Sequence, residues 1–246
     1  MSTLGLAGHL LRYDVRRMGR DPMLSFVFLD GFVSSLAPRW GWPALERWLL
    51  ASYGMDWTPY RPLVIASVAL LLGGFFLGIL VGFLLLEERE DGTLNALRVS
   101  PMPLRTYLLY RVALPVALSF VFTPAMILVM GLGSPPWHVV FWLTVANAPL
   151  GALGTLYFPS VARDKVQAFA YSKLLSFLTF LPIAAVFLEA PWWYFTGVFP
   201  GTWNALALRA AMRGEPWVGL LVTGAVTSWL ALWWLLRRFE RVVSRG

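Results

Sequence analysis

One uncharged apolar stretch constrains the fold more than any other feature of this chain. It covers residues 62–86, which are twenty-five positions in succession. A helix of about 20 apolar residues is long enough to cross the hydrocarbon core of a bilayer. The whole chain is 58% hydrophobic and only 13% charged, whereas soluble domains contain about 25% charged residues. The sequence therefore predicts an all-α polytopic membrane protein.

Hydropathy predicts six transmembrane helices within a single unit of residues 1–246, because no other stretch is long and polar enough for a soluble domain. The first span is expected to be retained rather than cleaved as a signal peptide, since Asp30 interrupts its apolar core and Pro38 follows. Prolines inside the spans are compatible with lipid-buried helices. The predicted spans are residues 22–38, 62–86, 107–132, 136–158, 172–189 and 217–236.

The distribution of basic residues predicts the orientation. With a cytoplasmic N-terminus, the inner segments carry fifteen Lys and Arg residues and the outer segments carry five. The positive-inside rule then predicts that both termini lie in the cytoplasm, and the expected location is a prokaryotic cytoplasmic (inner) membrane. Tryptophans gather in or beside the outer segments, as in an aromatic belt. Residues 40–53 and 199–212 are predicted to form short re-entrant or interfacial helices at the outer side.

The N-terminal segment, residues 3–21, has the pattern of an amphipathic interfacial helix. Apolar residues fall on one half of the helical wheel and basic residues on the other, and Pro22 disfavours helix at Asp21. Two interpretations are open: a lipid-surface anchor alone, or a contact with a partner protein. The basic face contains Arg12, Arg16, Arg17 and Arg20.

A charged segment, residues 87–105, follows the second span. Each charge would cost about 2.5–3.5 kcal/mol at the bilayer centre, so the segment is expected outside the membrane, on the cytoplasmic side. It is tied at both ends to transmembrane helices, which suits it to receive or deliver a push. The residues singled out are Glu87, Glu88, Arg89, Glu90, Asp91, Gly92, Thr93, Leu94, Leu97, Ser100 and Pro101.

Three glycines in the second span, Gly74, Gly78 and Gly82, repeat at four-residue spacing. Small residues at this spacing let two helix backbones approach closely. The contact is either within the subunit, which is slightly favoured, or between two copies.

Few residues are candidates for a substrate path. Asp30 is an ionisable group inside a span and hence a functional candidate; alternatively the span begins later and Asp30 lies near the outer loop. Asn147 is a weaker candidate, because such residues more often join helices. Phe76 and Phe177 represent the aromatic walls, which suit a hydrophobic or amphipathic substrate, although such aromatics more often face lipid or pack between helices.

Enzyme motifs are not found. His9 and His138 lie far apart, cysteine is absent, and no metal site or catalytic constellation is predicted. No P-loop occurs, because Lys165 and Lys173 follow Asp164 and Ser172. The chain is therefore expected to hold no cofactor itself, and any ATP and Mg²⁺ would bind to a partner subunit. Nucleic acid is not an expected partner, since the basic residues lie at span ends.

The charged segment resembles a motif of a known protein family. Glu88, Glu90, Gly92, Thr93 and Leu94, followed by Ser100 and Pro101, resemble the hallmark after the second span of the type-2 permease family of ATP-binding-cassette exporters. The likeness extends over nearly the whole chain and is greatest to the small drug-export permeases of the fluoroquinolone type. One departure is Asn95, where many members have glutamate.

The resemblance implies a permease subunit that exports a drug, lipid or peptide. Two such subunits would pair, as a homodimer or a paralogous heterodimer, each docked on a separate ABC ATPase subunit. Residues 87–105 would be the coupling helix, residues 3–21 the connecting helix, and the first, second and fifth spans would line the path. Membrane lipids would surround the pair. The alternatives are an ion-coupled secondary transporter or channel, and a non-transporting scaffold or immunity protein.

Overall fold

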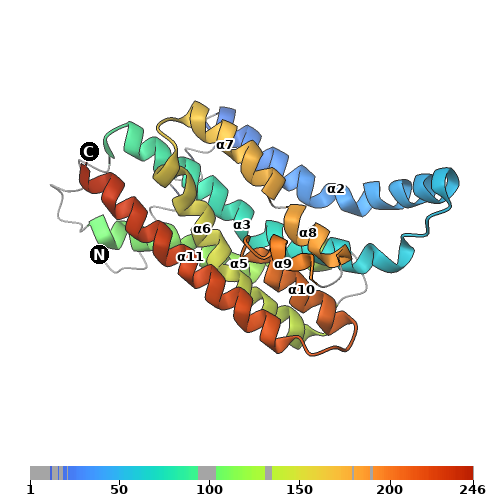
Figure 1. The fold of residues 1–246 in the computed structure, drawn as a ribbon. Helices are drawn as coiled ribbons and strands as arrows, with labels where there is room; N and C mark the ends of the chain where they lie inside the picture. The colour runs from blue at the N-terminus through green and yellow to red at the C-terminus, as the bar shows by residue number, and fades with distance from the viewer. Residues whose placement is uncertain are drawn as a thin grey trace.

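The computed structural model describes residues 22–93, 104–130, 135–178, 180–188 and 191–245, together with Arg12, Arg16, Gly19 and Arg20, and this part of the chain is all-helical (Figure 1). The helices are α2 (Pro22–Tyr53), the 3₁₀ turn η1 (Thr58–Tyr60), α3 (Arg61–Glu90), α5 (Leu104–Met130), α6 (Trp137–Val161), α7 (Lys165–Leu178), α8 (Phe180–Phe187), α9 (Trp193–Thr196), α10 (Gly201–Met212) and α11 (Val218–Arg245).

Membrane character follows from these helices. In the described residues, four stretches are long and apolar enough to cross a bilayer: Thr106–Val129, Trp137–Val161, Lys165–Ala185 and Val218–Phe239. The protein is a helical membrane protein. The count of six spans and the orientation stay predictions.

Several element boundaries differ from the predicted ones. The first span was expected to end at residue 38, before a separate interfacial helix at 40–53; instead α2 runs through Pro38 and Pro43 to Tyr53. Membrane helices can tolerate internal prolines because neighbouring groups satisfy the freed carbonyls. The predicted span 172–189 overlaps the apolar stretch Lys165–Ala185, which begins seven residues earlier. The charged residues 87–90 belong to the last turn of α3 rather than to a separate segment.

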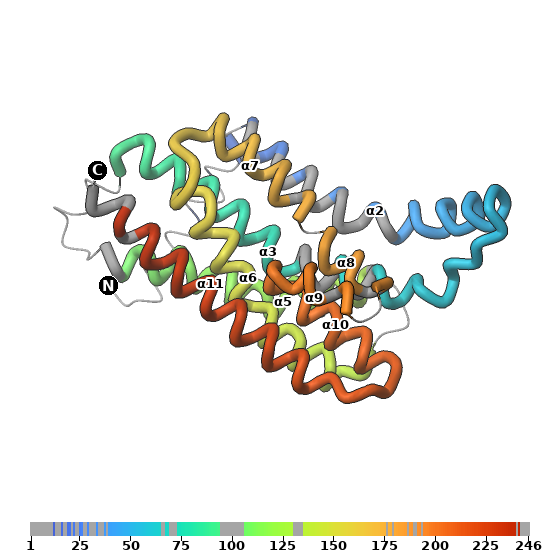
Figure 2. Tube along the Cα trace, viewed as in Figure 1, coloured from blue at the N-terminus to red at the C-terminus, as the bar shows by residue number. Residues whose placement is uncertain are grey.

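Helix α6 forms the centre of the bundle. It packs against α3, α5 and α11 (Figure 2). In its most apolar window 83% of the residues are buried, against 22% in α5 and 28% in α11. A helix that is apolar all round belongs in the interior, and α6 is surrounded by protein while its neighbours keep exposed apolar faces.

Glycines bring α3 and α6 into backbone contact. A Cβ added to Gly78 would lie 1.9 Å from the carbonyl oxygen of Gly151, and one added to Gly82 would lie 2.7 Å from that of Gly154. Gly74 faces α5, where a Cβ would lie 2.6 Å from Ser119 Oγ. The predicted glycine face thus packs within the subunit. Gly151 and Gly154, the matching residues of α6, were not anticipated.

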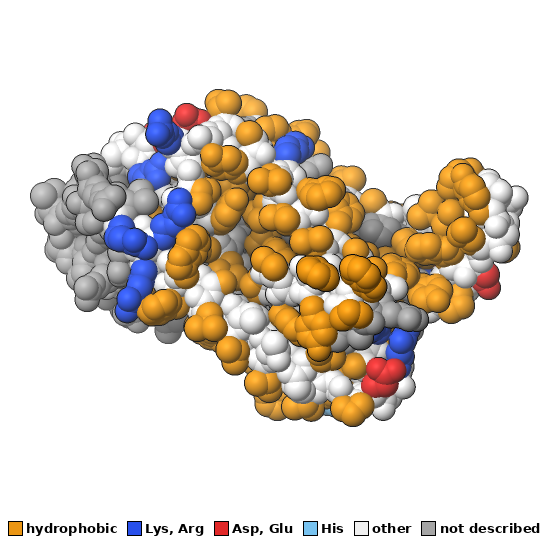
Figure 3. Space-filling view, in the orientation of Figure 1, with side chains coloured by type: hydrophobic (Ala, Val, Ile, Leu, Met, Phe, Trp, Pro, Cys, Tyr) orange, Lys and Arg blue, Asp and Glu red, His pale blue; other side chains and the backbone are white. Residues whose placement is uncertain are grey.

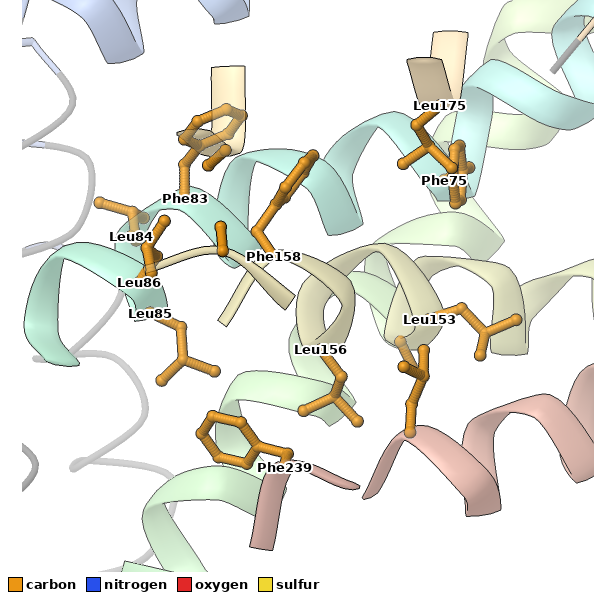
Figure 4. Close-up of a cluster of buried hydrophobic side chains, with 14 of the residues drawn as sticks. Phe75, Phe83, Leu84, Leu85, Leu86, Leu153, Leu156, Phe158, Leu175 and Phe239 are labelled. Atoms are coloured by element: carbon orange, nitrogen blue, oxygen red, sulfur yellow. The ribbon is translucent and has the colours of Figure 1, made fainter. Parts of the chain in front are cut away.

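Beyond this glycine contact, toward the C-terminal end of α3, large side chains fill the core. Phe83 of α3 packs on Phe158 of α6 with ring centroids 4.7 Å apart. Leu85 and Phe239 are fully buried in the same cluster, which joins α3, α6 and α11 (Figure 4). Because these side chains are almost completely buried, the end of α3 is firmly packed against α6 and α11.

Helix α10 is packed inside the bundle, with most of its residues buried, and its predicted re-entrant or interfacial position stays a prediction. Its Asn204 Nδ2 donates a hydrogen bond to Asn147 Oδ1 of α6 at 3.1 Å, and both side chains are buried. The Asn204 amide also lies against α11 at Gly224, where a Cβ would come within 2.3 Å of Asn204 Oδ1. This hydrogen bond and the close approach at Gly224 hold α10 between α6 and α11.

The end of α2, η1 and the start of α3 form a hairpin that projects from one end of the bundle (Figure 1). Glu46 of α2 is buried and accepts hydrogen bonds from Trp42 Nε1 at 2.7 Å and from Arg61 Nε at 3.0 Å. Arg61 Nη2 also contacts the second oxygen of Glu46. The hydrogen bond from Arg61 lowers the pKa of the Glu46 carboxyl from its ordinary value.

This lowered pKa predicts an acid-sensitive hairpin. The Glu46–Arg61 pair contributes fully above the ordinary glutamate pKa of about 4.3, and its contribution is lost as pH falls through the lower folded-state pKa, because the unfolded state binds the proton first. Wild type should therefore exceed Glu46→Gln in stability by about 1 kcal/mol near neutrality, and the difference should vanish under strong acid. Thermal unfolding of both proteins across pH measures it.

Glu215→Gln serves as the control, since Glu215 is an exposed carboxylate in the turn between α10 and α11. It should match wild type in thermal stability near neutral pH. A Glu46→Gln difference that persisted unchanged in acid would contradict the role assigned to the ionised pair.

Candidate functional site

One end of the bundle, called here the junction end, collects the C-terminal ends of α3, α6 and α11 and the first residues of α5 and α7 (Figure 1). The charged residues at the end of α3 lie here. Successive residues of an α-helix differ in direction by about 100°. The consecutive side chains of Glu87, Glu88 and Arg89 therefore point to three different helices, and each side chain forms a bond with one of them.

Glu88 points to α5 and forms a buried ion pair with Arg111. The two residues are 3% and 1% exposed. Arg111 Nη2 donates to Glu88 Oε1, and Tyr107 OH donates to Glu88 Oε2. Arg111 Nε donates to Tyr107 OH at 2.7 Å, which closes the network. Tyr107 and Arg111 can act together because residues four apart share one helix face. A buried charge needs such partners.

Arg89 points to the end of α6. Its guanidinium donates to the carbonyl oxygen of Pro159, to that of Ala162 at 2.6 Å and to that of Arg163 at 3.0 Å. The last carbonyls of a helix lack intrahelical partners and carry partial negative charge, so Arg89 caps α6. Burial lowers the pKa of Arg89, although an arginine remains charged.

Glu87 and Glu90 hold the start of α7. Lys165 Nζ donates to Glu87 Oε1 at 2.8 Å, and the backbone N–H of Lys165 donates to Glu90 Oε1 at 2.9 Å. A carboxylate at the first residue of a helix is favourable, because free N–H groups and the positive end of the dipole lie there. Asp164 adds a capping bond from Gln167 N at 2.8 Å. The end of α3 thus fixes where α7 begins.

Gly92 ends α3. Its φ of +72° lies in the left-handed region, which glycine adopts without the cost that a Cβ imposes. Asp91 and Thr93 on either side are exposed. The remaining predicted coupling residues, Leu94, Leu97, Ser100 and Pro101, lie outside the described residues.

The predicted connecting-helix residues Arg12, Arg16 and Arg20 are exposed, and Arg17 lies outside the described residues. The predicted path residues differ in exposure. Phe177 is 69% exposed on α7, whereas Asn147 is 1% exposed between helices.

Phe76 of α3 is half-buried. Asp30 lies within α2, and the structure does not describe its side chain. In the described residues, no group of three or more His, Cys, Asp or Glu side chains could hold a metal ion.

Sequence reasoning did not anticipate Tyr107, Arg111 and Lys165 as members of this site. Arg111 was interpreted only as a contribution to the positive-inside count. The available signal was its position: a cation four residues into an apolar span requires a partner, and an acidic run lies at the other end of the same connection.

This arrangement can transmit movement from the end of α3 to the neighbouring helices. Four consecutive residues, Glu87 to Glu90, join the end of α3 to α5, α6 and α7 through ionic and hydrogen bonds. The connection between α3 and α5 cannot be displaced at its α3 end without moving these three helices or breaking a buried ion pair.

Comparisons with known proteins show which family the chain matches. A family model described as "Fluoroquinolones export permease protein Rv2686c-like" matches residues 14–236. The chain is similar to the fluoroquinolones export permease protein Rv2686c of Mycobacterium tuberculosis strain ATCC 25618 / H37Rv, with 31% identity over 231 residues, 93% of this chain and 92% of the relative. The protein MT2760 of strain CDC 1551 / Oshkosh shows the same identity and coverage. No solved structure matches the chain.

Proposed function

Because this chain belongs to the family of Rv2686c-like fluoroquinolones export permeases, we propose that it is the permease subunit of an ATP-binding-cassette exporter. A separate ATPase subunit binds ATP and Mg²⁺ and docks at the junction end, which is the cytoplasmic end. The connection between α3 and α5 is the coupling segment. A second permease subunit, identical or paralogous, completes the transporter.

The observation that carries this proposal is the set of contacts at the end of α3. A lever that transmits movement must be rigid where it joins the helices it moves. Glu88 and Arg111 are almost completely buried, and Arg89 holds three carbonyls at the end of α6. A push on the coupling segment is therefore delivered to α5, α6 and α7 together with α3.

The substrate is a hydrophobic or amphipathic molecule taken from the membrane. Two relatives are named for fluoroquinolone export, so fluoroquinolones are the first compounds to test. The exposed faces of α2, α5 and α7 are apolar and aromatic, with Phe26, Phe120 and Phe177 among their exposed side chains. Apolar side chains of this kind favour a substrate that partitions from lipid; the same helices also carry the exposed cations Arg39, Arg47 and Lys173.

Coupling is tested with Leu94→Asp in the chain co-expressed with a stand-alone ATPase from the same organism. A charge placed in the centre of an interface costs about 2 kcal/mol or more, so the variant should bind the ATPase at least about tenfold more weakly. Fluoroquinolone-stimulated ATP hydrolysis and uptake into inside-out vesicles should fall with it, while the amount of permease in the membrane stays unchanged.

Leu50→Asp is the matched control, because Leu50 is 54% exposed in the hairpin at the opposite end of the bundle. It should retain binding and transport. Normal coupling in Leu94→Asp would exclude the α3–α5 connection as the coupling segment. Transport that follows an ion gradient and needs no ATPase would instead identify a secondary transporter.

A further inference from the structure

Helix α11 carries one exposed stripe whose chemistry changes along the helix axis. Its members recur at three- and four-residue spacing and therefore share a face. The opposite face, which includes Leu232, Leu235 and Phe239, is buried in the core. From the start of α11 to its end, the exposed members of the stripe are Val222, Val226, Trp229, Leu230, Trp233, Trp234, Arg237 and Arg241, and the half-buried Arg238 lies at its edge.

The apolar part of this stripe has the length of one lipid leaflet. From Val222 to Trp234 it covers about 18 Å at 1.5 Å per residue, and one leaflet of hydrocarbon is about 15 Å thick. Tryptophans prefer the boundary between hydrocarbon and headgroups. With Trp233 and Trp234 at that boundary, Arg237 and Arg238 lie one turn farther out, at the depth of lipid phosphates.

Both arginines are held by the tryptophans one turn before them. The guanidinium of Arg237 lies 4.1 Å from the ring centroid of Trp233, and that of Arg238 lies 5.5 Å from the ring of Trp234. Arg238 Nε also donates to the carbonyl oxygen of Ser160 at 3.3 Å, which ties it to α6. A stacked guanidinium loses less conformational freedom when it binds an anion.

The charge around this part of the stripe is positive. Residues 237–246 contain four arginines and one glutamate. Among the described side chains, no carboxylate pairs with Arg237 or Arg238. Figure 3 shows the Lys and Arg side chains of this end as a band that borders a hydrophobic surface. A ligand that fits must be anionic at one end and apolar along about one leaflet.

We propose that the stripe of α11 is a binding site for an anionic phospholipid. The acyl chains lie along Val222 to Trp234, and the phosphate-bearing headgroup contacts Arg237 and Arg238. A membrane lipid is favoured over a protein partner because the arginines continue an apolar face that extends a full leaflet deep. This site depends on the membrane location of the chain and is independent of the export function.

The test measures which lipid the full chain retains. The protein is placed in nanodiscs that contain phosphatidylcholine and phosphatidylglycerol in equal amounts, then released, and bound lipids are counted by native mass spectrometry. Wild type should retain phosphatidylglycerol preferentially. Each basic residue near a membrane surface contributes a factor of roughly five, so Arg237→Gln should lower the preference about fivefold and the double variant with Arg238→Gln about 25-fold.

Two controls keep the result interpretable. Arg47→Gln changes an exposed arginine at the opposite end of the bundle and should leave the preference unchanged. Arg237→Gln leaves the Arg238–Ser160 bond intact, so it reports on lipid binding even if the double variant folds poorly. High salt should weaken the preference of wild type, because exposed charges are screened.

Two results would overturn the proposal. The first is a phosphatidylglycerol preference that survives in Arg237→Gln and in the folded double variant. The second is a loss of binding to the co-expressed ATPase subunit in pure phosphatidylcholine, with lipid preference intact, which would assign the arginines to a protein interface.

Discussion

Replacing Arg111 by methionine is expected to lower the free energy of unfolding by about 3–5 kcal/mol, because it leaves the Glu88 carboxylate buried without its cation. Methionine approximates the volume of the arginine stem, so the loss reports on charge rather than on a cavity. Tyr107 can still donate to one oxygen of Glu88, but a single neutral donor does not replace a guanidinium. Unfolding in mixed micelles with increasing dodecyl sulfate, followed by circular dichroism, measures the change.

The comparison that gives this experiment its meaning is Lys165→Met. Lys165 pairs with Glu87 in the same region, but the two side chains are 25% and 13% exposed, against 1% and 4% for Arg111 and Glu88. Partly exposed pairs contribute about 1 kcal/mol or less. Equal losses in the two variants would mean that water reaches Glu88 and would remove the physical basis of the rigid junction.

A second substitution separates the charge from the pairing. Glu88→Gln in the Arg111→Met background removes the uncompensated carboxylate, so the double variant should be more stable than Arg111→Met alone. Its coupling should nevertheless be impaired, since the ionic tie between α3 and α5 is absent in both. Stability that recovers while substrate-stimulated ATP hydrolysis does not would locate the function of the pair in the junction rather than in folding.

Replacing Gly78 by alanine is expected to destabilise the protein by about 1–3 kcal/mol or more, as overpacking does. The added Cβ would meet three backbone atoms of Gly151 at 1.9, 2.7 and 2.9 Å. Backbone atoms cannot rotate away as a side chain can, so α3 and α6 must separate along their contact. Alanine favours helix over glycine by about 1 kcal/mol, and the predicted loss is what remains after this gain. Thermal unfolding in detergent gives the sign directly.

Gly41→Ala is the matched control. Gly41 lies within α2, and an added Cβ would meet nothing within 4 Å, so the helix propensity of alanine should make this variant slightly more stable. The pair of variants also tests the packing of the glycine face within the subunit. If Gly78→Ala left the subunit as stable as wild type but dissociated a dimer, the face would belong to a second copy and the α3–α6 contact would be wrong.

Much of the helical framework could be predicted because it depends on local composition. The uncharged run of residues 62–86 requires a helix in lipid wherever its neighbours lie, and α3 covers it. The glycine spacing predicted a close contact for the same reason, since small residues expose backbone whatever packs against them. The partner helix could not be predicted, because Gly151 and Gly154 are separated from Gly78 by more than seventy residues. Pro38 suggested a helix end that α2 passes through, since a proline's effect depends on what surrounds the helix.

The charged segment shows where local reasoning ends. The cost of charge in lipid predicts that Glu87 to Asp91 lie outside the hydrocarbon, and this prediction needs only the sequence by itself. Only the tertiary structure decided which helices these residues bind. Glu88 is paired with Arg111 of α5, and Arg89 caps α6. Glu87 and Glu90 bind the first residue of α7. The physical reason is that each bond joins residues brought together by the packing of four helices, and periodicity along one helix carries no information about the helix opposite.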